Sequence, residues 1–238
     1  MKALPNHSVY DVFMSAQEKH YVLFDFDGVI ADSFAASYAI VQKFCAHITH
    51  DHFRAGFEGN IHDAFDEWES RPHGLECDHG LDWDAEYGAI SQKIAGMFPG
   101  IDTVIKELAQ KYRLIIVSSG PDEFIEPFLE KVGIRDCFQE VMGNRVHKSK
   151  AEKMRMIFSK YGTTPETCIL ITDSLGDMRE GASVGVGSIG VSWGFQDRAT
   201  LQKGAPFRIV DDPRDIPNTV ENYFAAPSVS TEGTQAAP

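Results

Sequence analysis

The sequence lacks a surplus of positive charge and has no apolar run long enough to cross a membrane. Its 238 residues carry 22 Lys and Arg against 35 Asp and Glu, which gives a formal net charge of −13. Nucleic acids and anionic membranes bind basic surfaces, so we expect neither as a main partner. A membrane-spanning helix needs roughly 20 consecutive apolar residues, and no stretch supplies them. The hydrophobic fraction of 43% is still sufficient for a core.

Cysteine is also scarce, and nothing resembles a secretory signal. The four cysteines are widely spaced, at Cys45, Cys77, Cys137 and Cys168. The first residues, MKALP, are not followed by the apolar segment of a signal peptide. We therefore expect reduced thiols and a cytoplasmic protein.

Strand-like apolar runs alternate with helical patterns along most of the chain. The runs RLIIV (113–117) and CILIT (168–172) are typical of buried strands, whereas apolar residues recur at helical spacing over 154–161. Strands separated by helix-length segments predict βαβ units and a mostly parallel, doubly wound sheet. The expected fold class is therefore α/β with a Rossmann-like core.

One long segment interrupts this alternation. Residues 49–97 are polar and rich in histidine, with helical patches and no convincing strand. We predict an α/β core made of 1–32 plus 98–224 and an all-helical cap at 33–97. Residues 225–238 lack core-forming side chains and are predicted to be a disordered tail.

The most informative stretch is YVLFDFDGVIADS, residues 21–33. Its apolar run predicts a buried strand that ends in Asp25 and Asp27, followed by Gly28. Residues i and i+2 of an extended chain face the same side, so the two carboxylates can converge. Gly28 permits the turn that must follow. Clustered buried acids require a compensating cation, which indicates a divalent metal.

Polar residues also follow two other predicted strands. Ser118-Ser119-Gly120 follows RLIIV, and Asp173 follows CILIT with Asp177 four residues later. Parallel strands present their carboxyl ends at one edge, so these residues should meet Asp25 there. A hydroxyl group and the N–H groups of a tight turn can bind phosphate. Carboxylate oxygens are ligands suited to Mg²⁺.

These motifs, in this order, resemble the signatures of the haloacid dehalogenase superfamily. The resemblance extends from Val22 to about Val210 and is to members with a helical C1-type cap, such as phosphoglycolate phosphatases and β-phosphoglucomutase. It implies that Asp25 is the nucleophile and forms an aspartyl-phosphate. It also implies that Asp27 is the acid and base, and that Ser118 holds the phosphoryl group. The implied metal site comprises Asp25, Asp27, Asp173 and Asp177.

The resemblance leaves two lysines as candidates for the phosphate site. Members with a Lys-Pro-x-Pro pattern have this lysine 25 residues before the metal aspartate, which selects Lys148. Members similar to phosphoserine phosphatase have it 23 residues before, which selects Lys150. The prolines are absent and Lys150 leads directly into a predicted helix, so Lys150 is favoured.

Substrate contacts are expected from Ser119 and Gly120 in the core and from Arg54 and Asn60 in the cap. Six of the nine histidines also lie in 47–79. Among them, His73 and His79 flank a cysteine, but their spacing completes no closed four-ligand zinc site. We expect these histidines at the surface of the cap, with some facing the substrate.

The leading hypothesis is a Mg²⁺-dependent phosphatase acting on a small phosphorylated metabolite. Asp27 argues against two other chemistries, because superfamily members that cleave carbon–halogen bonds lack an acid there and phosphonate-cleaving members carry a small residue. A phosphosugar mutase similar to β-phosphoglucomutase and a phosphometabolite-binding module without turnover stay open as alternatives. The oligomeric state and the identity of the substrate also stay open.

Overall fold

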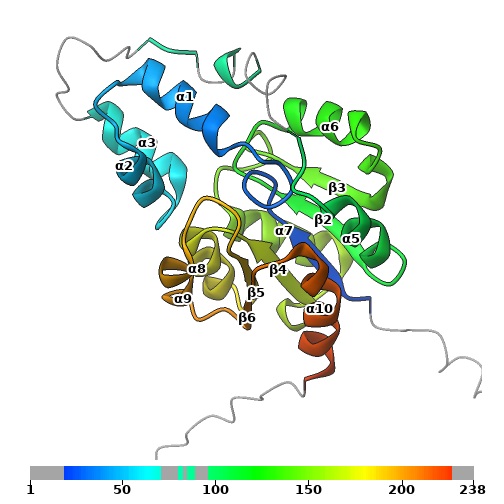
Figure 1. Ribbon diagram of the computed structural model, residues 1–238. Helices are drawn as coiled ribbons and strands as arrows, with labels where there is room; N and C mark the ends of the chain where they lie inside the picture. The colour runs from blue at the N-terminus through cyan, green and yellow to red at the C-terminus, as the bar shows by residue number, and fades with distance from the viewer. Residues whose placement is uncertain (1–18, 71–79, 83–84, 89–95, 227–238) are drawn as a thin grey trace, which may run out of the picture.

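A parallel β-sheet organises the chain. The computed structural model describes residues 19–70, 80–82, 85–88 and 96–226 (Figure 1). The strands of these residues are all parallel, in the order β3-β2-β1-β4-β5-β6. This order is that of a doubly wound sheet, so the predicted α/β, Rossmann-like fold is confirmed. The strands are β1 (Tyr21–Phe24), β2 (Arg113–Val117), β3 (Phe138–Met142), β4 (Cys168–Thr172), β5 (Gly187–Val191) and β6 (Arg208–Val210).

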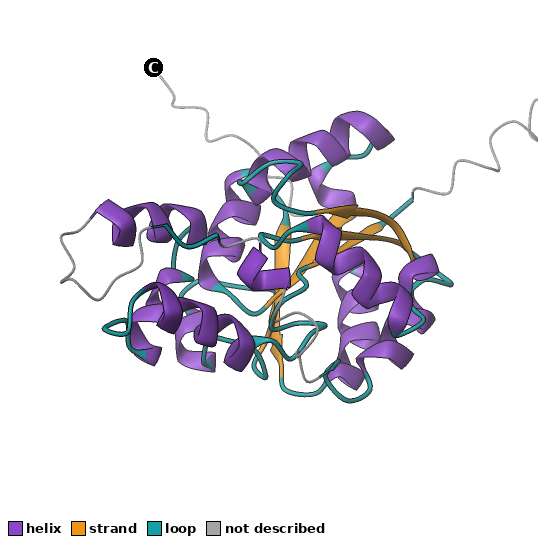
Figure 2. Cartoon of the chain, turned by 90° about the horizontal axis from the view of Figure 1, so that it is seen from above, coloured by secondary structure: helices purple, strands orange, loops and turns teal. Residues whose placement is uncertain are grey.

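Helices cover both faces of the sheet (Figure 2). Apolar residues of α5 (Ile101–Leu108), α6 (Asp122–Lys131) and α10 (Ile216–Ala225) join the cluster on one face. On the other face α7 (Lys150–Tyr161) packs on the sheet and beside α8 (Leu175–Ser183). A short helix, α9 (Arg198–Gln202), precedes β6.

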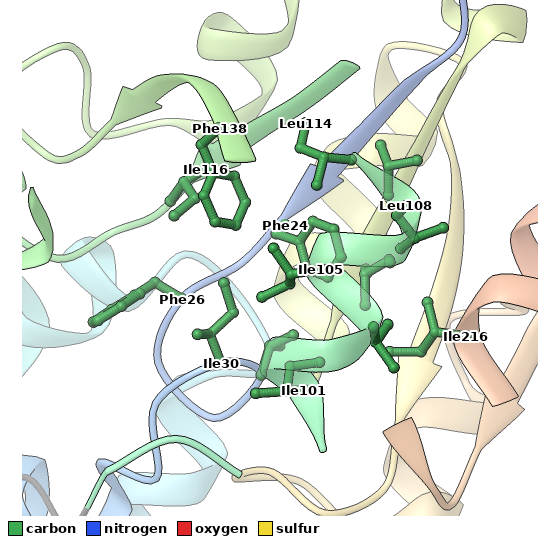
Figure 3. Close-up of a cluster of buried hydrophobic side chains, with 14 of the residues drawn as sticks. Phe24, Phe26, Ile30, Ile101, Ile105, Leu108, Leu114, Ile116, Phe138 and Ile216 are labelled. Carbon is green, nitrogen blue, oxygen red and sulfur yellow. The ribbon is translucent and has the colours of Figure 1, made fainter. Parts of the chain in front are cut away.

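The larger core cluster follows directly from the sequence periodicity. Ile101, Ile105 and Leu108 recur at i, i+4 and i+7 and point from α5 toward the sheet, where Phe24 and Leu114 lie (Figure 3). None of these five side chains is more than 1% exposed. Burial of each such side chain stabilises the fold by about 1.5–3 kcal/mol.

The cap region of the chain forms helices with a small core of their own. The helices α1 (Phe34–Phe44), α2 (His50–Gly56) and α3 (Ile61–Ser70) lie together, away from most of the sheet (Figure 1). Their apolar residues form a separate cluster that also includes Phe195 of the core. The predicted limits of the cap, 33 and 97, stay a prediction. Residues 71–79, which include His73, Cys77 and His79, and 227–238 of the predicted tail lie outside the described residues.

One prediction about the cysteines is wrong. Cys45, which is buried at the end of α1, is disulfide-bonded, whereas Cys137 and Cys168 are free thiols. Widely spaced cysteines can be brought together by the fold, and their spacing in the sequence does not indicate which of them meet. The cysteines therefore no longer support the prediction of a reducing compartment. Within the described ranges, no helix combines the length and the apolar character needed to cross a membrane.

The cap meets the core closely at the start of α8. The N–H group of Gly176 donates to the carbonyl oxygen of Phe57 at 2.9 Å. A Cβ atom at Gly176 would lie 2.0 Å from the carbonyl oxygen of Gly59. Only a residue without a side chain therefore lets this cap loop rest on α8.

We predict that Gly176→Ala lowers the free energy of unfolding by about 1–3 kcal/mol, because the added methyl group forces the loop away from α8. Gly59→Ala is the matched control. A Cβ atom at Gly59 meets no atom within 4 Å, so this change should cost less than about 0.5 kcal/mol. Urea unfolding of both variants measures the difference, and equal stabilities would contradict the prediction.

Candidate active site

Two acids meet where β1 and β4 end. Asp25 directly follows β1, and Asp173 directly follows β4. The two strands are parallel neighbours, and the N–H group of Asp25 donates to the carbonyl oxygen of Ile171 at 2.9 Å. The strand order reverses between β1 and β4, which is where open α/β sheets bind their ligands.

A glycine lets the two strand ends come close together. Gly28 adopts a left-handed conformation, with φ of +76°, which other residues rarely adopt. A Cβ atom at this position would lie 1.9 Å from Oδ2 of Asp173. Gly28 is therefore needed for the turn, as predicted, and also for the close approach of Asp173.

Burial opposes the charge of both acids. Asp25 is 7% exposed and Asp173 is 2% exposed. Burial raises the pKa of Asp25 well above its usual value, although the ammonium group of Lys150 acts in the opposite direction. Burial also raises the pKa of Asp173 to about 7, although the N–H group of Phe195 donates to Oδ2 at 2.6 Å. Both carboxylates thus lack sufficient positive charge nearby.

Lys150 is the cation within this group of acids. It is the first residue of α7 and is 1% exposed. Its Nζ atom lies 2.8 Å from Oδ1 of Asp25 and 2.6 Å from Oδ2 of Asp177. Burial favours the neutral amine, but the carboxylates of Asp177 and Asp25 outweigh it and raise the pKa of Lys150. Lys148, the other candidate, is exposed on the preceding loop, so the geometry favours Lys150.

Asp177 is held by two donors. Its Oδ2 atom accepts from Lys150 and from the hydroxyl group of Thr172, at 2.6 Å each. Burial alone would raise the pKa of Asp177, but the Lys150 ammonium group and the hydrogen bonds from Asp25, Lys150 and Thr172 together outweigh burial and lower it. Asp177 is therefore ionised, and its task as a metal ligand stays a prediction.

The acids suit Mg²⁺ by their chemistry, although they are not grouped as a ready-made metal site. The described part of the chain contains no group of three or more His, Cys, Asp or Glu side chains placed to hold a metal ion. The ammonium group of Lys150 lies between Asp25 and Asp177 instead. The donors are nevertheless all carboxylate oxygens, and the raised pKa values of Asp25 and Asp173 indicate that a further cation would stabilise their charge. Mg²⁺ keeps several waters and takes phosphate oxygens as ligands, so it needs only part of a protein cage.

Asp27 has a partner in the cap that the sequence did not indicate. The hydroxyl group of Tyr87 lies 2.8 Å from each carboxylate oxygen of Asp27. Burial raises the pKa of Asp27, and hydrogen bonds from Ser33 and Tyr87 partly oppose this. Burial and the charge of Asp27 raise the pKa of Tyr87 well above its usual value. The phenol therefore keeps its proton and acts as the donor.

The serine turn after β2 contains the expected groups and one further lysine. Ser118 is 1% exposed, and its Oγ atom accepts from the N–H group of Gly120 at 3.0 Å. Behind this turn, the fully buried Lys153 donates from Nζ to the carbonyl oxygen of Ser118. Burial, together with repulsion from Lys150, lowers the pKa of Lys153 to about 8. In the sequence, only the position of Lys153 one helical turn after Lys150 could have pointed to this contact with the serine turn.

A cavity of about 430 Å³ lies between the core and the cap. The four acids, Lys150, Ser119 and Gly120 line it, whereas Ser118, Thr172 and Lys153 do not. Asn60 lines the cavity, as predicted for a substrate contact, but Arg54 does not. The guanidinium group of Arg54 lies 4.4 Å from the centre of the Phe34 ring and donates to the carbonyl oxygen of Phe195. The predicted residues that line the cavity are Asp25, Asp27, Asn60, Ser119, Gly120, Lys148, Lys150, Asp173 and Asp177.

His62 of α3 also lines this cavity and has an unusual environment. Its Nε2 atom is buried and has no hydrogen-bond partner among the described residues. Burial, with repulsion from Lys148 and Lys153, lowers the pKa of His62 to about 4. The imidazole is therefore neutral at pH 7 and presents an unused polar atom on the cap side of the cavity.

This environment predicts how stability changes with pH. The pKa of His62 is about 4 in the folded chain and about 6.5 in an unfolded chain. Although the raised pKa values of Asp25 and Asp173 act in the opposite direction, the unfolded state binds more protons at His62 between these values, so the contribution of His62 to stability should fall as the pH is lowered from about 6.5 to about 4. His62→Gln should reduce this fall, as measured by urea unfolding across that range. His52→Gln, at an exposed position of α2, is the control and should keep the wild-type slope. Identical slopes for all three proteins would refute the assignment.

The chain is similar to known phosphatases in sequence and to known hydrolases in fold. A phosphoglycolate phosphatase of Synechococcus elongatus is 24% identical over 203 residues, which cover 82% of this chain and 94% of that protein. A phosphoglycolate phosphatase of Salmonella paratyphi A is 27% identical over 138 residues, which cover 56% of this chain and 55% of that protein. The crystal structure of a hydrolase from Pseudomonas syringae superposes with a TM-score of 0.70 at 17% identity, over 86% of this chain and 99% of that one.

The chain also matches the model of a whole protein family. The model of the haloacid dehalogenase-like hydrolases matches residues 22–191, which span the sheet from β1 to β5 and include every acid of the site. The resemblance inferred from the sequence motifs is thereby confirmed. The chain belongs to the haloacid dehalogenase-like hydrolase family.

Proposed function

We propose that the chain is a Mg²⁺-dependent phosphatase that hydrolyses a small phosphorylated metabolite through an aspartyl-phosphate. The observation that supports this most strongly is the convergence of four acids, Lys150 and the serine turn on one cavity of about 430 Å³. Small-molecule sites have volumes of about 300–1,000 Å³, so the cavity suits a metabolite and not a macromolecule. The relatives named phosphoglycolate phosphatases make phosphoglycolate the first substrate to test.

Asp25 is the proposed nucleophile. Its carboxylate is at the end of β1, on the floor of the cavity and beside Lys150. An oxygen of Asp25 forms a bond to phosphorus while the bond from phosphorus to the leaving oxygen breaks. Water then attacks the same phosphorus atom, and the bond to Asp25 breaks to release inorganic phosphate.

Asp27 is the proposed acid and base for these two steps. In the first step its proton passes to the leaving oxygen, and in the second it takes a proton from the attacking water. Burial raises the pKa of Asp27, which favours the protonated form that the first step needs.

The remaining groups neutralise and orient the phosphoryl group. Lys150 supplies positive charge beside Asp25. In the serine turn the N–H group of Gly120 donates to Oγ of Ser118, so the proposed donors to the phosphoryl group are the hydroxyl groups of Ser118 and Ser119. Asp25, Asp27, Asp173 and Asp177 are the proposed region for Mg²⁺, which supplies charge neutralisation when it is bound. Phosphoryl transfer depends mainly on such positioning and neutralisation.

The leaving group would lie on the cap side of the cavity. Asn60 and His62 line that side, and Lys148 stands at the rim with an exposed ammonium group. An amide, an unpaired imidazole nitrogen and a cation suit a leaving group that carries an acid, as phosphoglycolate does. Because Arg54 does not line the cavity, these three are the proposed contacts of the leaving group, while Ser119 and Gly120 are the proposed contacts of the phosphoryl group.

We predict that phosphatase activity is lost on treatment with EDTA and returns with Mg²⁺, because the buried carboxylates need a further cation. The assay measures release of inorganic phosphate from phosphoglycolate and a panel of phosphorylated metabolites. Circular dichroism of the EDTA-treated protein is the control for folding. Full activity in a metal-free protein would contradict the proposal.

We also predict that Asp25→Asn reduces phosphate release to background while the chain stays folded. Because burial raises the pKa of Asp25, its charged form contributes little to folding, and the amide is a close match in shape. Thermal unfolding and the phosphate assay are both required. A wild-type rate in this variant, once contaminating phosphatases are excluded, would remove Asp25 as the nucleophile.

Assays of binding, phosphate release and isomerisation distinguish the phosphatase from the two alternative functions. A wild-type chain that binds phosphoglycolate without releasing phosphate would indicate a binding module. A mutase would instead convert β-glucose 1-phosphate to glucose 6-phosphate when catalytic glucose 1,6-bisphosphate is present. Rapid isomerisation with negligible phosphate release would therefore replace the phosphatase by a mutase and retain the same site.

A further inference from the structure

The contact between Tyr87 and Asp27 joins the cap to the proposed acid of the core. Tyr87 belongs to a helical turn at 85–88, sixty residues after Asp27, and its hydroxyl group is 2.8 Å from both carboxylate oxygens. Both residues line the active-site cavity. The phenol is thus a cap side chain in direct contact with a proposed catalytic group.

The turn at 85–88 packs closely against the core at Phe124 and at Gly120. The rings of Tyr87 and Phe124, the latter on α6, have centroids 5.7 Å apart, and a Cβ atom at Gly88 would lie 2.6 Å from the Phe124 ring. A Cβ atom at Gly120 would lie 3.1 Å from Oδ2 of Asp27 and 3.4 Å from the Tyr87 hydroxyl oxygen. Glycines at both positions therefore let the phenol fit closely against Asp27.

We propose that Tyr87 is a positioning residue that orients Asp27 and stabilises the charge that forms on it when it protonates the leaving group. The inference rests on the proposed phosphatase reaction. A phenol has one proton, so it satisfies one oxygen of Asp27 and leaves the other to hold the proton for transfer. As the bond from phosphorus to the leaving oxygen breaks, this proton moves to the leaving oxygen and Asp27 becomes a carboxylate.

The hydrogen bond from Tyr87 strengthens during this step, because hydrogen bonds to a charged acceptor are stronger than those to a neutral one. It therefore stabilises the transition state more than the ground state, which increases the rate. The size of this rate increase depends on the leaving group. An alcohol must be protonated as it leaves, whereas p-nitrophenol leaves readily as its anion and needs no proton.

The test is Tyr87→Phe, assayed with an alkyl phosphate, phenyl phosphate and p-nitrophenyl phosphate. The quantity measured is kcat/KM, which reports the first phosphoryl transfer and not the later hydrolysis. We expect a loss of roughly 10- to 100-fold with the alkyl phosphate, the range for one hydrogen bond to a charged group. The loss should be smaller with phenyl phosphate and smallest with p-nitrophenyl phosphate.

The ratio of kcat/KM values for two substrates does not depend on the fraction of folded enzyme, so the comparison holds even if Tyr87→Phe is less stable. Tyr38→Phe is the matched control, since the Tyr38 hydroxyl group donates to the carbonyl oxygen of Ile48 at 2.9 Å, and Tyr38 does not line the cavity. It should leave the ratio unchanged. Asp27→Asn should show the same order of losses as Tyr87→Phe.

Equal losses of Tyr87→Phe with all three esters, or no loss, would overturn the assignment of Tyr87 while the phosphatase proposal stands. A wild-type chain that hydrolyses none of the esters, with Mg²⁺ present, would overturn the phosphatase proposal and the inference together. The two failures are thus distinguished by the wild-type rate.

Discussion

The structure depends most on how the charges at the ends of β1 and β4 are balanced. Asp25, Asp173 and Asp177 are buried there, and a buried carboxylate is costly unless it is paired. Lys150 compensates Asp25 and Asp177 because α7 begins at this residue and directs its side chain inward. Asp173 receives a backbone hydrogen bond from Phe195 and no ion pair among the described contacts. The one ammonium group of Lys150 does not balance these three carboxylates, which is the physical basis for proposing a metal ion here.

Much of the fold and the site's framework could be predicted, because both follow local rules. Buried parallel strands are nearly continuous apolar runs, so β1, β2 and β4 were evident from the sequence. Acids and hydroxyl groups directly after such runs must lie at one edge of the sheet, which placed Asp25, Ser118 and Asp173 together. The spacing alone did not separate Lys148 from Lys150. The start of α7 at Lys150 favours this residue, since it is buried whereas Lys148 is exposed.

What could not be predicted depends on contacts between distant parts of the chain. Tyr87 meets Asp27 and Lys153 meets Ser118 through the packing of the cap and α7, and no periodic pattern encodes either contact. Cys45 is disulfide-bonded for the same kind of reason. Arg54 of the cap was expected at the substrate. Its planar guanidinium group instead stacks on Phe34 and binds a backbone carbonyl group, an arrangement available to any arginine near an aromatic ring.

Two contacts between cap and core connect the cap to the proposed catalytic residues. The loop 57–60 rests on α8, two residues after Ser174 and beside Asp177, while Tyr87 reaches Asp27 from the other end of the cap. Any rearrangement of the cap that admits a substrate must therefore preserve or remake the hydrogen bond to Asp27. The proposed leaving-group contacts of the cap and the proposed acid Asp27 are thus linked through Tyr87. If Asp27 is the acid, a substitution in the cap can change the rate of proton transfer without touching the substrate.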